Sequence, residues 1–347
     1  MLHLVGNAPS SGSTLLADLL DSATNSACGP ELEFFCNKYL YNFKSFQKNI
    51  YKTSHTATLR ATGIFPQYGN LSAYGLTKDQ LTKMIRGASS LTEFFNSFAM
   101  NYNNYRKNKR DSIVFEKTPQ NINCIDEFLQ SYPNGFFITM VRNPLYVYNS
   151  LLNRGWGNYT ALCTWLISNA LIEPFLSHER VRIVKYEDLV REPFIQVSSL
   201  LSELSGEKID PLVLENNYKQ NIYRQNFTAR LKSWEANSAA QVINANTKQI
   251  SERVKIEFSK LLSLKISKSY SAHYDIPEIT FKHLLTAFGY SETIRNTLNN
   301  VSIEDTMPRK DFKDYRKLVA KWLREIKIGY AKVTNYRVYL EAVETSN

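Results

Sequence analysis

The sequence has no hydrophobic run that approaches the roughly 20 apolar residues needed to cross a lipid bilayer. It also lacks the cationic stretch and long apolar region of a secretory signal near Met1. Its cysteines, Cys28, Cys36, Cys124 and Cys163, show no paired CxxC spacing, so we expect neither a disulfide framework nor a metal site. These absences favour a folded protein of the cytosol with reduced thiols.

The charge of the chain is unbalanced. Its 42 Lys and Arg residues exceed its 32 Asp and Glu residues, which gives a net charge of +10. Such a surplus favours anionic partners, among them nucleic acid, anionic membranes and phosphorylated small molecules. The sequence has no helix-turn-helix, zinc-finger or RNP-like pattern, which argues against nucleic acid. A solvated basic surface would explain the surplus equally well.

Short apolar, β-rich runs alternate with helical patterns along the first 205 residues. The predicted strands are residues 2–6, 112–116, 135–142 and 181–186. Helical spacing of apolar residues follows each of them, at residues 14–21, 123–132, 144–153 and 193–204. This alternation predicts an α/β fold, in which a parallel sheet is flanked by helices.

Two further segments complete the predicted organisation. Residues 24–111 are too many for a simple crossover and carry helical patterns at 32–43, 76–85 and 91–105. We expect them to form a helical insertion on the acceptor side of a domain that covers residues 1–265, over the carboxyl ends of the strands. Residues 266–347 are expected to form a helical C-terminal extension packed on that domain. Its apolar stripe between Phe312 and Ile326 predicts either packing or a docking surface.

A loop rich in hydroxyl groups joins the first predicted strand to the first predicted helix. Backbone N–H groups and the positive end of a helix can bind a phosphate at such a place. The residue after Gly12 is Ser13, where a Walker A loop has lysine, which disfavours an ATPase or an ordinary kinase. The candidate anion-binding residues are Pro9, Ser10, Ser11, Gly12, Ser13 and Thr14.

This loop resembles the P-[KR]-S-G-[ST]-T loop of the superfamily of sulfotransferases that use 3′-phosphoadenosine 5′-phosphosulfate (PAPS). Arg142 and Ser150 resemble its 3′-phosphate motif, in which an arginine ends a strand and a serine lies eight residues further on. The resemblance extends over about residues 2–240. It implies a P-loop-like sulfotransferase fold, PAPS as co-substrate, adenosine 3′,5′-bisphosphate as product and no metal.

The loop departs from the family pattern at Ser10, where the family has lysine or arginine. Lys117 matches a family lysine that follows the second core strand, and is therefore the candidate cation for the 5′-phosphosulfate. Tyr186 lies in a Tyr-Glu-Asp-Leu segment that relatives place near the adenine. A basic and aromatic patch matches a region that relatives place against the 3′-phosphate, and its residues are Arg230, Lys232 and Trp234.

The acceptor must lose a proton, and Pro119 stands where cytosolic members have a histidine base. The segment around Cys28 resembles a stretch of tyrosylprotein-type and several bacterial sulfotransferases in which a glutamate after Cys-Gly is the base. This implies Glu31 as base, with Glu33 as second choice and His55 as an outside candidate. The residues expected at the acceptor site are Glu33, His55, Phe65 and Tyr68.

The function predicted from the sequence is in-line transfer of a sulfuryl group from PAPS to a hydroxyl or N–H of a small-molecule acceptor, as in the tailoring of a secondary metabolite. Three alternatives stay open. The chain could be a non-catalytic protein of the same fold that binds adenosine bisphosphate, a peptide tyrosine sulfotransferase, or a nucleotide-dependent phosphotransferase. The last is disfavoured because no carboxylate pair stands where a phosphotransferase would hold Mg²⁺.

Overall fold

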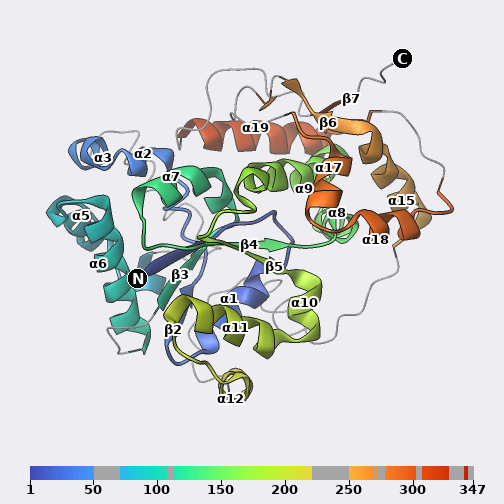
Figure 1. Ribbon diagram of the computed structural model, residues 1–347. Coiled ribbons are helices and arrows are strands. Elements are labelled where there is room, and N and C mark those ends of the chain that lie inside the picture. The colour runs from blue at the N-terminus through green and yellow to red at the C-terminus, as the bar shows by residue number, and fades with distance from the viewer. Residues whose placement is uncertain are drawn as a thin grey trace. The chain divides into compact units, whose positions relative to one another are not determined.

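A computed structural model describes residues 1–50, 71–107, 113–220, 250–268, 270–271, 278–301, 307–327 and 340–342 (Figure 1). The chain forms two compact units. The first contains residues 1–7, 12–140 and 178–245, and the second contains residues 8–11, 141–177 and 246–347. In the part of the chain that the structure describes, no helix is both long and apolar enough to cross a membrane.

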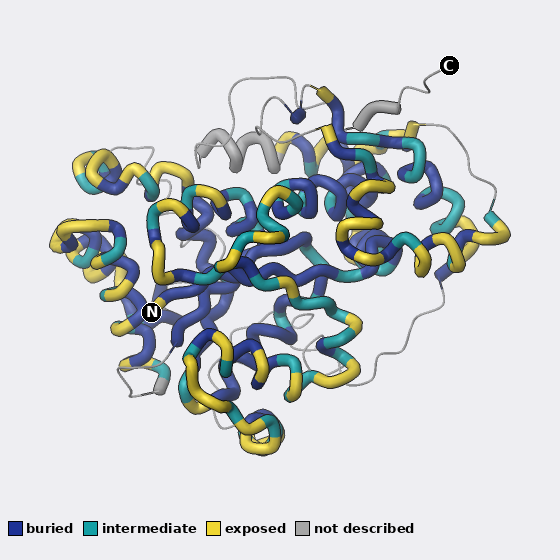
Figure 2. Tube along the Cα trace, in the orientation of Figure 1, coloured by how far each residue is buried: buried dark blue, intermediate teal, exposed yellow. Residues whose placement is uncertain are grey.

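The first unit is built on a parallel sheet of five strands in the order β2-β3-β1-β4-β5. The central strand β1 pairs in parallel with β3 on one side and β4 on the other. Strands β1, β2, β3 and β4 are buried in the middle of this unit, whereas the edge strand β5 is only partly buried (Figure 2). Their bounds are Leu2–Val5 for β1, Ser26–Gly29 for β2, Ile113–Lys117 for β3, Phe137–Val141 for β4 and Val181–Lys185 for β5.

The α/β fold and the four strands predicted from the sequence are confirmed. The edge strand β2 was not predicted, because its four residues, Ser-Ala-Cys-Gly, include no β-branched or aromatic side chain. Residues 24–111 therefore supply one strand of the sheet, besides helix α6 (Leu91–Lys107), which contacts β1, β2 and β3.

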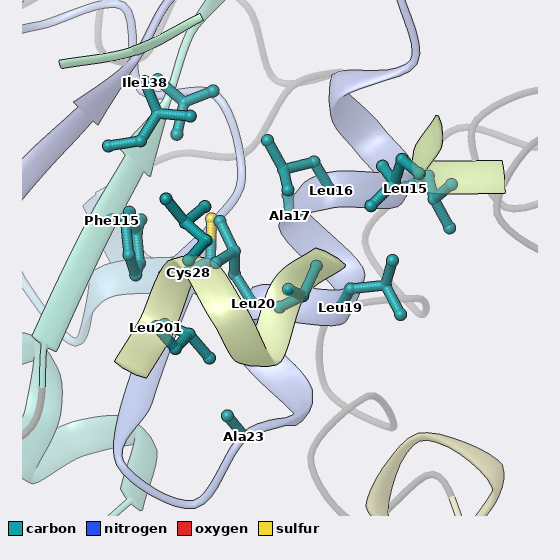
Figure 3. Packing of buried hydrophobic residues seen from close by; sticks show 14 of the residues in the cluster. Leu15, Leu16, Ala17, Leu19, Leu20, Ala23, Cys28, Phe115, Ile138 and Leu201 are labelled. Carbon is teal, nitrogen blue, oxygen red and sulfur yellow. The ribbon is translucent and has the colours of Figure 1, made fainter. Parts of the chain in front are cut away.

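One face of the sheet is covered by aliphatic side chains. Helix α1 (Ser13–Ser22) contacts α11 (Pro193–Ser205) and α12 (Pro211–Lys219) on this face. Leu16 and Leu20 of α1 are fully buried, in a cluster that also contains Phe115, Ile138 and Leu201 (Figure 3). Burying leucine-sized side chains stabilises a fold by about 2 kcal/mol each, so this cluster fixes α1 to the sheet.

A second cluster in the first unit is aromatic. Phe35 meets Phe95 and Phe98 edge to face, with ring centroids 5.3 and 5.0 Å apart. Such pairs add about 0.5–1.5 kcal/mol to the burial of the rings. The remaining elements of this unit are α2 (Lys38–Tyr41), α3 (Phe43–Asn49), η1 (Leu71–Tyr74), α5 (Lys78–Gly87), η2 (Pro119–Cys124), α7 (Ile125–Ser131) and α10 (Tyr186–Arg191).

The helix predicted over residues 32–43 is shorter than expected, since only its last part is helical, as α2. The N–H groups of Leu32 and Glu33 donate to side chains of the β3 end, and Glu33 has a left-handed backbone with φ of 55°. Both features prevent this segment from continuing as a helix. All four cysteines are buried and none forms a disulfide.

The second unit is mainly helical. Helix α9 (Asn158–Ile172) contacts α8 (Pro144–Asn153), α17 (Phe281–Ala287) and α19 (Phe312–Lys327). Its other elements are η3 (Glu173–Phe175), α15 (Glu252–Ser259), η4 (Lys260–Ser263), β6 (Leu264–Ile266), α18 (Ser291–Thr297) and β7 (Leu340–Ala342). This grouping joins residues from both sides of position 265, and the predicted boundary there stays a prediction.

Helix α19 is fixed to the start of α9 by a buried carboxylate. Asp314 accepts hydrogen bonds from the N–H of Thr160 at 2.8 Å and from its hydroxyl at 2.9 Å. An anionic group is favourable at this helix end. Leu318 is buried beside it, whereas Phe312 and Val319 of the same predicted stripe are exposed. Part of the stripe is therefore packed and part faces outward.

A buried ion pair ties α6 to α1 in the first unit. The guanidinium of Arg106 contacts Asp21, whose other carboxylate oxygen accepts the N–H of Cys28 at 3.1 Å. The side chains of Arg106 and Asp21 are 8% and 2% exposed, so neither charge can be solvated if its partner is removed.

We therefore expect Arg106→Met to lower the free energy of unfolding by about 3 kcal/mol, because it leaves a buried carboxylate without its counter-charge. Adding Asp21→Asn should recover part of that loss. Chemical denaturation measures both, with Lys38→Met as the control, because Lys38 pairs with Glu127 at the surface and its loss should cost less than about 1 kcal/mol. Equal losses in Arg106→Met and Lys38→Met would contradict the role given to the buried pair.

Candidate functional site

The candidate site of the first unit begins at the carboxyl ends of three neighbouring strands. In the sheet register Val5 lies beside Lys117, and Gly29 lies beside Glu116. The N–H of Thr118 donates to the carbonyl of Val5 at 3.2 Å, which holds the ends of β1 and β3 together. The carboxyl ends of β1, β2 and β3 are therefore followed by the hydroxyl-rich loop, the segment that carries Glu31, and the segment after Lys117, respectively. Open α/β sheets bind ligands at the carboxyl ends of their strands.

Helix α1 starts at this edge directly after Gly12. Gly12 has φ of 95°, in the left-handed region, and a Cβ there would lie 2.4 Å from the ring of Tyr186. Glycine is therefore required at this position. Among the residues that the structure describes, no side chain caps the start of α1, so its first N–H groups keep their capacity to bind an anion. Ser13 and Thr14 form the first turn of this helix.

Residues 8–11 of the loop belong to the second unit, where two arginines bind Ser10. Arg142 Nη1 donates to the Ser10 carbonyl at 3.1 Å, and Arg154 Nη1 donates to Ser10 Oγ at 2.9 Å. Ser10 has φ of 68°, a left-handed conformation that is uncommon for serine and often marks a functional loop. The hydroxyl of Ser11 is buried and has no hydrogen-bond partner within the described residues.

Arg142 is held by its own neighbours in the second unit. Its carbonyl accepts the indole N–H of Trp165 at 2.8 Å. Asn143 caps α8 by accepting the N–H of Leu145 at 3.0 Å, and Pro144 occupies the first turn, as the sequence predicts. Ser150 lies on this same helix, half-buried, two turns after its start. The predicted placement of the Arg142 and Ser150 motif, a strand end followed by a helix, is present.

The candidate cation and the candidate base form an ion pair in the first unit. Lys117 Nζ lies 2.8 Å from Glu31 Oε1, and the two side chains are 3% and 11% exposed. Glu31 lies 86 positions away from Lys117 in the chain, so no local pattern in the sequence indicates this ion pair. Lys117 and Glu31, which two separate sequence motifs predict as cation and base, are therefore in contact.

Buried hydrogen bonds position the segment that carries Glu31. Thr118 Oγ1 donates to Glu116 Oε1 at 2.6 Å, and accepts the N–H groups of Leu32 at 3.2 Å and Glu33 at 3.1 Å. Glu116 Oε1 also accepts the N–H of Leu32 at 3.0 Å. Glu116 and Thr118 therefore hold the backbone immediately after Glu31. Lys117, which lies between them in the sequence, binds the carboxylate of Glu31.

The other side of the Glu31 segment is held by Tyr74. Its hydroxyl donates to the carbonyl of Pro30 at 2.6 Å, and its ring lies 2.3 Å from where a Cβ on Gly29 would be. Tyr74 is fully buried. Any larger residue at position 29 would displace Tyr74 and with it the turn that leads to Glu31.

Three residues of the site carry no motif that singles them out in the sequence: Glu116, Thr118 and Arg154. Their contacts span 84, 85 and 144 positions of the chain. Of the predicted residues, Glu33 is buried and Pro9 is half-buried. The remaining predictions lie outside the described residues, and these are His55, Phe65, Tyr68, Arg230, Lys232 and Trp234.

Burial raises the pKa of Glu116 to about 7, although hydrogen bonds from Asn121, Thr118 and Leu32 oppose this rise. The folded protein therefore holds this proton more tightly than the unfolded chain, whose glutamates titrate near pH 4.5. As the pH rises from about 4.5 to about 7, this carboxyl group lowers the stability of the fold.

We expect Glu116→Gln to remove a decline in the free energy of unfolding on the order of 3 kcal/mol between pH 4.5 and 7. The amide keeps an acceptor for Thr118 and Leu32 but no longer titrates. Denaturant unfolding across this pH range measures the slope in both proteins. An identical slope in the variant would assign the decline to other groups.

The model of the sulfotransferase family matches residues 4–210, which is more than half of the chain. No curated protein matches it significantly. Among solved structures, it is similar to the sulfotransferase domain of the curacin biosynthetic pathway, with 20% identity over 88% of this chain and 98% of that one, and a TM-score of 0.46.

Two further structures are similar to the chain. The sulfotransferase domain of the Synechococcus PCC 7002 olefin synthase has 18% identity over 72% of this chain and 89% of that one, with a TM-score of 0.45. Sulfotransferase STF9 from Mycobacterium avium has 13% identity over 87% of this chain and 77% of that one, with a TM-score of 0.37. With the family match over residues 4–210 and the predicted loop and Arg142 motif within that range, the chain belongs to the sulfotransferase family.

Proposed function

We propose that this sulfotransferase transfers the sulfuryl group of PAPS to a hydroxyl or N–H of a small-molecule acceptor. The observation that carries the proposal is the 2.8 Å pair between Lys117 and Glu31 at the carboxyl edge of the sheet. The reaction needs a cation for the charge that develops on the leaving phosphate and a base for the acceptor's proton. Lys117 and Glu31 supply these two groups side by side.

The residues of the loop fit the anionic end of PAPS. The uncapped start of α1 and the buried hydroxyl of Ser11 offer donors to the 5′-phosphosulfate. Arg142, with its fixed fork of N–H donors, and Ser150 are the proposed ligands of the 3′-phosphate. Tyr186, whose ring covers Gly12, is the proposed contact of the adenine. PAPS supplies the sulfuryl group, and bound product is adenosine 3′,5′-bisphosphate.

In the proposed reaction the acceptor oxygen or nitrogen forms a bond to sulfur while the bond from sulfur to the bridging phosphate oxygen breaks. Glu31 takes the proton of the acceptor. Lys117 and the loop N–H groups stabilise the negative charge that the leaving phosphate gains. Thr118 and Glu116 act as positioning residues, because they hold the backbone after Glu31 by the hydrogen bonds described above.

The acceptor is proposed to be a small metabolite that is modified late in its synthesis. This rests on the resemblance of the segment around Cys28 to bacterial-type sulfotransferases. Residues 24–111 are the proposed acceptor side. They include the turn from Gly29 to Glu31, which follows the carboxyl end of β2. Glu33, His55, Phe65 and Tyr68 stay candidates for contacts with the acceptor.

Isothermal titration with adenosine 3′,5′-bisphosphate tests the donor. We expect micromolar binding that ATP does not match, since the loop has no Walker A lysine. Adding Mg²⁺ should leave the affinity for the bisphosphate unchanged. Absence of binding, or a preference for ATP, would contradict the proposal.

Glu31→Gln tests the base. We expect turnover of PAPS with a panel of hydroxyl and amine acceptors to fall by about 100-fold or more, because the amide cannot take the proton. The affinity for adenosine 3′,5′-bisphosphate should stay within about threefold, since Glu31 has no proposed contact with the nucleotide. Glu33→Gln, measured beside it, tests the second candidate for the base. Glu207→Gln, at an exposed glutamate of the same unit, is the control and should retain full activity. Normal turnover in Glu31→Gln, or a larger loss in Glu33→Gln, would reject Glu31 as the base.

A further inference from the structure

The loop from Pro9 to Thr14 contains no cationic side chain, although its proposed ligand is strongly anionic. Backbone N–H groups and hydroxyls carry only partial charges, and a full positive charge nearby would strengthen the binding of a phosphosulfate. The second unit holds such a charge beside Ser10, which belongs to the same unit. Arg154 Nη1 donates to Ser10 Oγ at 2.9 Å.

The fold specifies the place of Arg154. It is the C-cap of α8, and Gly155 follows it with φ of 78°. The N–H of Gly155 donates to the carbonyl of Leu152 at 2.9 Å, and that of Trp156 donates to the carbonyl of Leu151 at 3.1 Å. This pair of bonds is the Schellman motif, which ends a helix in a defined geometry. A cation is also favourable at the negative end of a helix.

The same helix connects Arg154 to Arg142. Arg142 precedes α8 and donates to the carbonyl of Ser10 at 3.1 Å, while Arg154 ends α8 and donates to the hydroxyl of the same residue. Ser10 is therefore held from both ends of α8. The planar guanidinium of arginine carries five N–H donors, a geometry that suits the oxygens of a phosphate group.

We propose that Arg154 supplies the positive charge that the loop itself lacks, and thereby binds the 5′-phosphosulfate end of PAPS. This rests on the proposed function and extends it to a residue outside the motifs. Arg154 then replaces the lysine or arginine that the family has at position 10, and its guanidinium is held by the hydroxyl of Ser10. Arg142 remains the proposed ligand of the 3′-phosphate.

The test compares two nucleotides that differ only at the 5′ position, adenosine 3′,5′-bisphosphate and adenosine 3′-monophosphate. Isothermal titration of Arg154→Met should show affinity for the bisphosphate reduced by about tenfold or more, as expected for a lost charge-assisted hydrogen bond. Affinity for the monophosphate should change by less than about threefold. Arg154 is exposed, so the variant should fold, and its Tm checks this.

Charge relocation makes the test specific. Adding Ser10→Lys to Arg154→Met should restore the affinity for the bisphosphate to within about threefold of the native protein, because the cation returns to the loop. Arg295→Met is the matched control, since Arg295 is an exposed arginine in the last turn of a helix of the same unit, and it should leave both affinities unchanged.

The inference is overturned if Arg154→Met binds the bisphosphate normally, if it loses both nucleotides equally, or if Ser10→Lys restores nothing. If the native protein binds neither nucleotide, the proposed function fails and this inference fails with it. That outcome is distinguishable, because it appears before any variant is measured.

Discussion

The ion pair between Lys117 and Glu31 is the contact on which the candidate site depends. Its two charges are almost entirely buried and lie 2.8 Å apart, so each makes the presence of the other tolerable. Lys117 comes from the end of β3, and Glu31 comes from the turn after β2, its neighbour in the sheet. Parallel pairing of these strands therefore brings the proposed base and the proposed cation together from distant parts of the chain.

The surroundings of this pair are polar and buried, which makes its geometry rigid. Thr118 and Glu116 hold the turn by its backbone, and Tyr74 holds it from the other side through Pro30. A satisfied network of this kind orders a site, whereas the loss of one member leaves a buried group without its partner. The ion pair of Arg106 and Asp21 likewise joins α6 to α1, and both of these helices contact β2.

Much of the fold could be predicted from the sequence because its signals are local. The β4–α8 junction is an example, since the apolar run before Arg142 and the proline at 144 each predict their own element. Strand β2 could not be predicted, because a four-residue segment without β-branched side chains is a strand only when β3 lies beside it. The helix expected at Leu32 was wrong for a related reason, as its N–H groups bind Thr118 and Glu116.

The candidate site likewise contains residues that the sequence could predict and one that it could not. Sequence patterns identify positions that follow strands or precede helices, as Gly12, Arg142 and Lys117 do. Arg154 was missed because its relation to Ser10 exists only after α8 has formed and ended at Gly155. The sequence showed that the loop lacks a cation, but a contact between Ser10 and an arginine 144 positions away leaves no local pattern.

The central claim is that the loop and its two arginines bind a PAPS-type nucleotide, and a crystal structure with adenosine 3′,5′-bisphosphate tests it most directly. The account predicts the guanidinium of Arg154 on the 5′-phosphate and that of Arg142 on the 3′-phosphate. A nucleotide bound elsewhere, or bound at the loop with Arg142 and Arg154 both turned away from it, would contradict the account.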